Sequence, residues 1–273
     1  MTGLLLHLAA PLQSWGEHSA FTDRDTVAHP TRSALIGMIA AAMGIPRAEA
    51  LTDDLSRPFS RLPRLRFTIR IDRPGTHLVD FHTVGGGYPA HRTLPTAKGT
   101  RRGKDTATLV SHRHYLTDAA FTIAVTAPGD TTLLADCAHA LTHPRWPLYL
   151  GRRSCPPAPP LLLRADAPDP VDELKQIPLA RPQPTTHGTD EAATVTVRLT
   201  SDTPFNEGPH PAPSSKHAVT TLNDEPVRLT ARDRIHHART AYTTSWELPA
   251  EQCAGYGSDY LDALDTYLHP REG

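Results

Sequence analysis

Two adjacent arginines, Arg152 and Arg153, lie between Gly151 and Ser154 in the segment YLGRRS, which begins at Tyr149. Their planar guanidinium groups suit either a phosphate or the edge of a nucleobase. Gly151 would let a ligand approach the backbone closely, and the prolines that follow would direct the chain away from it. A solvated turn is the alternative interpretation, and these few residues do not decide between the two.

A second candidate phosphate site lies in the segment HPTRSALIG, which places Arg32 between Thr31 and Ser33 at the start of a predicted helix. Free backbone amides, the positive end of the helix dipole, two hydroxyl groups and a guanidinium group would converge there. The alternative is an ordinary capped helix with a surface arginine.

An aromatic side chain in the polar loop LQSWG could contact a nucleic acid. Trp15, which follows Gln13 and Ser14, could stack on a base. It could equally anchor the core or an interface. The two interpretations stay open at this point.

Histidines gather in the segments DFHTV and SHRHYL, which contain His82, His112 and His114. With Arg113 and Tyr115 beside them, they could hydrogen-bond RNA or cleave it by general acid–base chemistry without a metal. The His-x-His spacing has no third carboxylate or cysteine nearby, which makes it poor for metal binding. No metal site and no cofactor are therefore expected.

The charged residues are unevenly distributed along the chain. The 28 basic and 29 acidic residues give a formal net charge of −1, which alone argues against nucleic-acid binding. Basic residues are nevertheless concentrated in 57–73, 92–113 and 145–164, whereas acids collect in 166–191 and 247–265. This segregation, rather than the total, decides whether a phosphate surface can form.

The three cysteines, Cys137, Cys155 and Cys253, are widely spaced and give neither a disulfide framework nor a metal-binding pair. A reducing, cytoplasmic location is expected. The apolar runs are too short to span a bilayer, and no basic segment precedes the first of them. A membrane partner is not expected.

Hydrophobic periodicity predicts an α+β fold. Strands are expected at 4–8, 64–72, 121–125 and 147–151, with helices at about 31–43 and 130–141. This order is the β-α-β-β-α-β pattern of a ferredoxin-like core, interrupted by a basic insertion at about 80–116. The predicted organisation is a core at 1–155, a Pro-rich linker at 156–190, a small β unit at 191–246 and an acidic tail at 247–273.

Several segments together resemble one protein family. LHLAAPLQSWG, HPTRSALIGMIAAAMGI, DFHTVGGG, SHRHYLTDAAFTIAV and WPLYLGRRSCP occur in the order seen in the CasD family, the Cas5-type (RAMP) subunit of the type I-E CRISPR Cascade complex. The resemblance covers roughly Leu4 to Trp246. Two features depart from the family: the segment PTAKGTRRGKDTATL is unusually basic, and the tail after Trp246 has no counterpart.

The resemblance implies a ferredoxin-like (RRM-related) core with a β-hairpin thumb at about 80–116. It further implies a non-catalytic subunit, active in antiviral defense, that grips the repeat-derived 5′ handle of the crRNA and nucleates assembly. Its partners would be the Cascade backbone subunit and the large PAM-reading subunit, with target DNA reached through the assembled complex. The RNA-binding residues would then be Gln13, Ser14, Trp15, Thr31, Arg32, Ser33, His82, Thr83, Arg113, His114, Tyr149, Gly151, Arg152, Arg153 and Ser154.

An enzyme is the main alternative. In type I-C systems a related subunit cleaves the repeat RNA itself, using tyrosine, lysine and histidine. The corresponding candidates here are His112, His114 and Tyr115, with Lys98 or Lys104 as the lysine. A DNA-binding or pure assembly module is disfavoured, because the basic residues lie in several loops that the fold would bring together.

Overall fold

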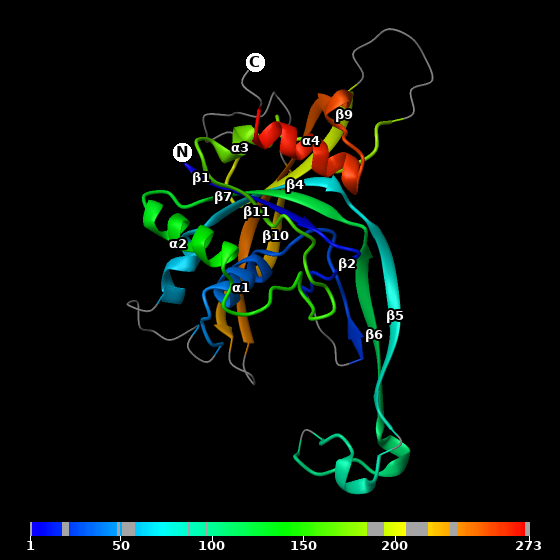
Figure 1. The fold of residues 1–273 in the computed structure, drawn as a ribbon. Coiled ribbons are helices and arrows are strands. Elements are labelled where there is room, and N and C mark those ends of the chain that lie inside the picture. Colours follow the sequence, from blue (N-terminus) through cyan, green and yellow to red (C-terminus); the bar gives the residue numbers. More distant parts are fainter. Residues whose placement is uncertain are drawn as a thin grey trace.

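A large antiparallel sheet is the centre of the fold (Figure 1). The computed structural model describes residues 2–17, 22–47, 50, 58–86, 88–96, 98–184, 194–205, 218–229 and 234–270. Within these residues the sheet has the strand order β10-β11-β9-β4-β7-β1-β8. The strands are β1 (Gly3–Ala9), β4 (Arg66–Arg73), β7 (Ala120–Thr126), β8 (Leu162–Ala167), β9 (Thr194–Ser201), β10 (Ala218–Leu229) and β11 (Arg234–Pro249). The protein is therefore α+β.

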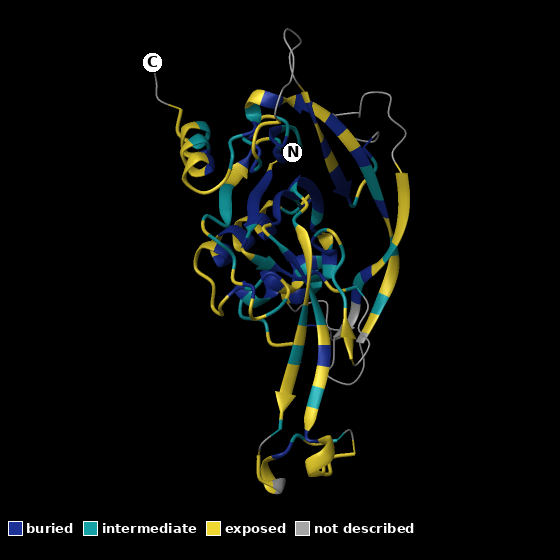
Figure 2. Ribbon diagram, turned by 90° about the vertical axis from the view of Figure 1, so that its right-hand side faces the viewer, coloured by how far each residue is buried: buried dark blue, intermediate teal, exposed yellow. Residues whose placement is uncertain are grey.

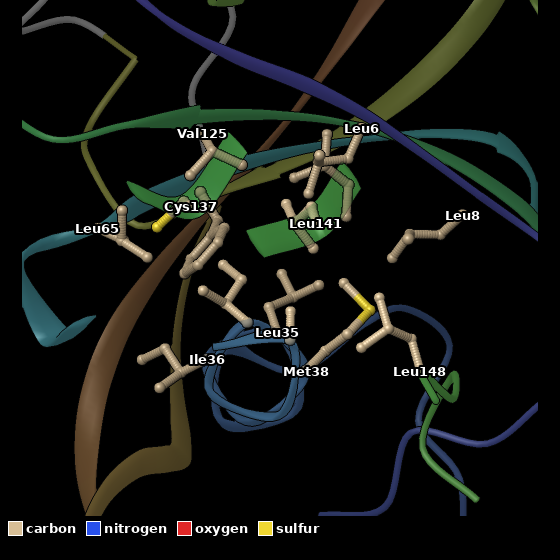
Figure 3. Close-up of a cluster of buried hydrophobic side chains, with 14 of the residues drawn as sticks. Leu6, Leu8, Leu35, Ile36, Met38, Leu65, Val125, Cys137, Leu141 and Leu148 are labelled. Carbon is tan, nitrogen blue, oxygen red and sulfur yellow. The ribbon is translucent and has the colours of Figure 1, made fainter. Parts of the chain in front are cut away.

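Two helices cover one face of this sheet. They are α1 (Arg32–Ala42), capped by the Thr31 side chain, and α2 (Thr131–Thr142), capped by Asp130. Each cap oxygen accepts a hydrogen bond from a backbone amide of the first turn, which would otherwise lack a partner. Figure 3 shows the apolar side chains of α1 converging with those of the sheet and α2 in one buried cluster.

The opposite face of the sheet is covered by residues from the last part of the chain. The helices α3 (Pro170–Glu173) and α4 (Ser258–Leu268) lie there, with the short 3-10 helix η4 (Ala250–Gln252) between β11 and α4. Leu174, Ile177 and Leu264 are buried in the second apolar cluster. The central strands β1, β4 and β7 are thus enclosed on both faces, whereas β10 at the edge is largely exposed.

A long β-hairpin projects from this body (Figure 1). Its strands, β5 (Thr76–Gly85) and β6 (Thr108–Thr117), pair antiparallel along their whole length, from Thr76 with Thr117 to Gly85 with Thr108. The short 3-10 helices η2 (Ala90–Arg92) and η3 (Lys104–Thr106) lie beyond these strands, and Figure 2 shows that this end is largely exposed. The sequence predicted an insertion at this place, and the observed hairpin begins four residues earlier than expected.

Short strands fasten the base of the hairpin to the body. β2 (Leu12–Gln13) pairs antiparallel with β6, and β3 (Asp23–Arg24) pairs with it in parallel. The loop before α1 is therefore held against the hairpin. The 3-10 helix η1 (Pro58–Arg64) leads into β4 on the other side.

The strand predicted over 64–72 is present as β4. The face of this strand that carries Arg70 is buried rather than exposed to solvent. Arg70 is fully buried and forms an ion pair with Asp72, with 2.6 Å between Nε and Oδ1. Its guanidinium group also donates to the carbonyl oxygens of Leu174, Ile177 and Pro178. The arginine is needed inside because these carbonyl groups would otherwise lack donors.

The strand predicted at 147–151 is wrong. That stretch is a loop, and the strand that pairs with β1 on this side is β8, inside the region expected to be a linker. The linker interpretation of 156–190 is also corrected, because Leu174, Ile177 and Leu179 are core residues. Residues 185–190 of that region lie outside the described residues.

The boundary expected at residue 191 does not separate two units. β9 pairs with β4, with Thr68 opposite Ser201, so the later strands continue the same sheet. Within the small β unit expected at 191–246, residues 191–193, 206–217 and 230–233 lie outside the described residues. The tail expected after residue 246 holds the end of β11 and all of α4, so it belongs to the folded body. No helix in the described part of the chain combines the length and hydrophobicity that a membrane span requires.

Candidate nucleic-acid interface

The segment that carries Arg152 and Arg153 is a tight turn held against the loop before β3. The amide of Leu150 donates to the carbonyl of Cys155, and the amide of Ser14 donates to the carbonyl of Leu150. Gly151 has φ +90°, and a Cβ atom there would overlap the carbonyl oxygen of Ser14. Glycine is required at this position because no side chain fits between the two segments.

Arg152 is held by two neighbours rather than free in solvent. Its guanidinium carbon lies 4.8 Å from the centroid of the Tyr115 ring, within the range of a cation–π contact. Its Nη2 donates to the carbonyl of Arg24 at 2.8 Å. Nη1 is buried and has no hydrogen-bond partner among the described residues. The side chain is therefore held in place while one strong donor remains uncommitted.

Four arginines converge beside this turn. Arg24, Arg113, Arg152 and Arg153 line one cavity of about 420 Å³ together with Ser154. No carboxylate of the described residues lines it. Arg24 and Arg113 are brought together because β3 and β6 pair in register at these two residues. Four cations around one concave space attract a polyanion more strongly than the net charge of −1 suggests.

A larger groove adjoins the arginine-lined cavity, and Arg24 and Arg152 line both. It encloses about 840 Å³ between the exposed side of α1 and the loops that carry Gly16 and Trp146. Thr31 and Ser33 line it at the start of α1, and Gly37 and Ala41 continue its wall along the helix. The wall that α1 contributes to this groove thus carries no charged side chain after Arg32, the first residue of the helix.

Histidines lie at the base of the hairpin. The Nε2 of His114 is 3.1 Å from Oδ1 of Asp23, and its Nδ1 is 3.1 Å from Nε2 of His77. His82 lies 3.2 Å from a carboxylate oxygen of Asp80, two residues back on the same strand. Thr83, next to it, is exposed. These side chains are accessible enough to hydrogen-bond a ligand that follows the hairpin.

Two of the predicted RNA-binding side chains, Gln13 and Trp15, are internal and join β2 to the core. Trp15 is 1% exposed and donates through Nε1 to the side-chain oxygen of Gln13. Gln13 is fully buried and donates to the carbonyls of Leu8 and Ala119. Neither side chain can meet RNA in this arrangement, because both are used to join β2 to the core. The prediction that Trp15 stacks on a base is corrected to a core role.

Arg32 is also corrected. Its side chain is 3% exposed, lies against Glu225 through Nε, and pairs with Asp202 at 2.6 Å. It also donates to the carbonyls of Pro63 and Leu65. With its nitrogens committed to these groups, the guanidinium group does not form the phosphate site that the sequence predicted. It fixes the start of α1 against β4, β9 and β10.

Some of the remaining predicted residues are buried and support the fold, whereas others lie at the surface. Ser14 is buried, and its hydroxyl donates to the carbonyl of His114. Thr31 is buried as the helix cap, whereas Ser33 is partly exposed, and both line the groove. Tyr149 is partly buried ahead of the turn, and Ser154 is exposed on it. Sequence reasoning missed Arg24, since only the pairing of β3 with β6 places it in the cavity.

The residues required for the enzymatic alternative are not gathered. Lys98 and Lys104 lie beyond the two hairpin strands, whereas His114 is six residues inside β6. At about 3.4 Å per residue this separates Lys104 from His114 by roughly 20 Å. Tyr115 is 5% exposed, and its hydroxyl lies 3.4 Å from that of Ser154. No group of three potential metal ligands is found among the described residues.

Comparison with known proteins shows the family to which this chain belongs. The family model described as CRISPR-associated protein (Cas_Cas5) matches residues 3–242. The chain therefore belongs to the CRISPR-associated Cas5 family, to which CasD also belongs.

Within this family, the chain is similar to several individual proteins. The chain is 36% identical over 181 residues to the CRISPR system Cascade subunit CasD of Escherichia coli (strain K12), covering 63% of this chain and 75% of that protein. A chain in a solved structure described as a CRISPR RNA-guided surveillance complex is 45% identical, with a TM-score of 0.78, and the match covers 97% of this chain and 99% of that one. A second structure, described as a Cas protein, matches at 27% identity with a TM-score of 0.55, covering 93% and 98%.

Proposed function

We propose that this chain is a non-catalytic crRNA-binding subunit of a type I-E Cascade complex. It grips the repeat-derived 5′ handle and nucleates assembly with the backbone subunit and the large PAM-reading subunit. The complex, rather than this chain alone, then reaches target DNA. The similarity of this chain to the Cascade subunit CasD and to a chain of a CRISPR RNA-guided surveillance complex supports membership in such an assembly.

One observation carries the RNA-binding part of this proposal. The cavity lined by Arg24, Arg113, Arg152 and Arg153 lies where the hairpin, the loop before β3 and the Gly151 turn meet. Arg152 and Arg153 hold handle phosphates there, and the exposed Arg153 is the more mobile donor of the two. His82, Thr83 and His114 contact the same strand farther along the base of the hairpin.

The order of the elements supports a ferredoxin-like core for this proposal. β1, α1, β4, β7, α2 and β8 follow one another, and the four strands lie in the order β4-β7-β1-β8. We infer an RRM-related core in which the connection between β4 and β7 has grown into the hairpin.

The hairpin suits contact with other subunits. Leu78, Val79 and Phe81 are exposed on β5, and Phe81 is 64% exposed. A run of exposed apolar side chains on a projecting element marks a protein interface. We assign this surface to the neighbouring backbone subunit.

The test is a binding titration with RNA carrying the 5′ handle of the cognate repeat. We expect the Arg152→Ala/Arg153→Ala variant to bind at least tenfold more weakly than the unchanged protein. Arg61→Ala is the matched control. It also removes a positive charge, but Arg61 pairs with Asp130 and Asp136 of the α2 region. Equal affinity of the double variant and the unchanged protein would refute the assignment.

A further inference from the structure

Gly37 stands in the middle of α1 without a packing reason. A Cβ atom built there meets no atom of the protein within 4 Å. Glycine inside a helix costs up to about 1 kcal/mol relative to alanine. The internal structure would therefore accept, and gain from, a larger residue at this position. The space beside Gly37 is part of the 840 Å³ groove.

The groove is continuous with the arginine-lined cavity. Arg24 and Arg152 line both spaces, and the buried Nη1 of Arg152 lacks a partner among the described residues. An uncommitted buried donor at the junction is costly unless a ligand supplies an acceptor. A strand whose phosphates meet the arginines would therefore pass the mouth of the groove.

The groove favours a base over a phosphate. Gly37, Ala41 and Ile45 offer an apolar wall along α1, and the exposed ring of Trp146 lies at its border. Glu17 and Asp25 line the groove together with Arg24, Arg47 and Arg152, so its charges are mixed, and the apolar wall rather than the charge favours a base. A carboxylate can accept a hydrogen bond from the amino group of a base. The volume of the groove, about 840 Å³, also falls in the range of roughly 300–1,000 Å³ that small-ligand sites occupy.

We infer that this groove receives one unstacked nucleobase of the bound RNA, laid against Gly37 and Ala41 of α1 beside Trp146. The glycine keeps this space open for the ring. This inference rests on the proposed RNA-binding function and adds a base-binding site to it. It also predicts that binding depends on a base at one position of the RNA, whereas the arginines depend on charge alone.

The test combines a cavity-filling variant with RNA that lacks one base. Gly37→Leu adds a side chain on the groove side of the helix, where a Cβ atom meets no protein atom within 4 Å, so we expect it to fold at least as stably as the unchanged protein. Ala135→Leu is the matched control, because Ala135 is an exposed residue on α2 and gains the same side chain. Both are titrated with handle RNA and with a series in which each nucleotide in turn is abasic.

We expect Gly37→Leu to bind intact handle RNA about tenfold more weakly, which is within the effect of losing one stacked base. At one abasic position the unchanged protein and Gly37→Leu should bind equally. Equal binding of intact RNA by both proteins would overturn the inference. A loss of affinity in Gly37→Leu that persists at every abasic position would also overturn it. The same holds if Gly37→Leu binds RNA normally but fails to join the other subunits, since the groove would then hold a polypeptide.

The Arg152→Ala/Arg153→Ala variant in the same titration separates the two proposals. If it loses affinity while Gly37→Leu does not, the RNA-binding function stands and the base site is refuted. If both variants bind like the unchanged protein, both proposals fail.

Discussion

Gly151 and Ser14 are in such close backbone contact that a Cβ atom at residue 151 would overlap the Ser14 carbonyl oxygen. The contact fixes the turn carrying Arg152 and Arg153 against the loop that leads to Arg24. We expect Gly151→Ala to lower the free energy of unfolding by about 1–3 kcal/mol, because φ +90° is strained for alanine and the two segments must separate. Handle-RNA affinity should fall as well. Denaturant unfolding and RNA titration check both effects, and Gly129→Ala, at another positive φ but with no atom near its Cβ, separates strain from overlap.

Arg32 should matter for stability rather than for direct RNA contact. Arg32→Met removes the guanidinium group that pairs with Asp202 and lies against Glu225, although Asp202 keeps its ion pair with Arg239. Breaking a buried ion pair costs about 3–5 kcal/mol. We expect a large drop in thermal stability. Arg153→Ala, at an exposed position, should show the reverse pattern, with unchanged stability and weaker RNA binding. An Arg32→Met protein of normal stability would contradict the internal role.

The buried His7 should make stability fall on acidification. Burial, partly offset by Asp72, lowers the pKa of His7 from 6.5 to about 4. Below pH 6.5 the unfolded chain therefore takes up a proton that the folded chain does not, and stability declines until about pH 4. The expected loss is roughly 3 kcal/mol, at 1.36 kcal/mol per pH unit.

This pH effect is measured as a difference between two proteins. Free energies of unfolding are determined from pH 7.5 to 4 for the unchanged chain and for His7→Gln, which cannot be protonated. The two curves should converge as the pH falls. Curves that stay parallel would show that His7 is not held neutral in the fold.

The last helix should be part of the cooperative fold. Leu264 is 2% exposed in the second apolar cluster, whereas Leu261 on the same helix is 43% exposed. We expect Leu264→Ala to cost about 2–4 kcal/mol and Leu261→Ala less than about 0.5 kcal/mol. Chemical unfolding of the two variants tests this, and equal costs would mean that α4 does not pack as described.

Local patterns in the sequence were enough to predict α1, α2, β4 and the place of the basic insertion, whereas the resemblance to the CasD family implied that the insertion is a hairpin. Thr31 and Asp130 cap the two helices, and both ends could be placed from the sequence because a cap is a contact between near neighbours in the chain. The strand at 147–151 failed because a short apolar run does not distinguish a strand from a buried loop. β8 was missed because prolines around it suggested a linker.

Contacts between distant residues could not be predicted from one sequence. Arg32 looked like a surface arginine at a helix start, yet the carboxylates that bury it come from residues 170 and 193 positions away. Arg24 joined the cavity only through the pairing of β3 with β6. The sequence left the role of Trp15 open between stacking on a base and packing in the core. Its hydrogen bond to Gln13 shows that it belongs to the core.

The most direct test of the central claim mixes the full-length protein, in EDTA, with labelled precursor repeat RNA and separately with mature handle RNA. The account predicts salt-sensitive binding of the handle, weakened in Arg152→Ala/Arg153→Ala, with both RNAs remaining full length. Site-specific cleavage of the repeat that disappears in His114→Ala would contradict it and make this chain a processing ribonuclease.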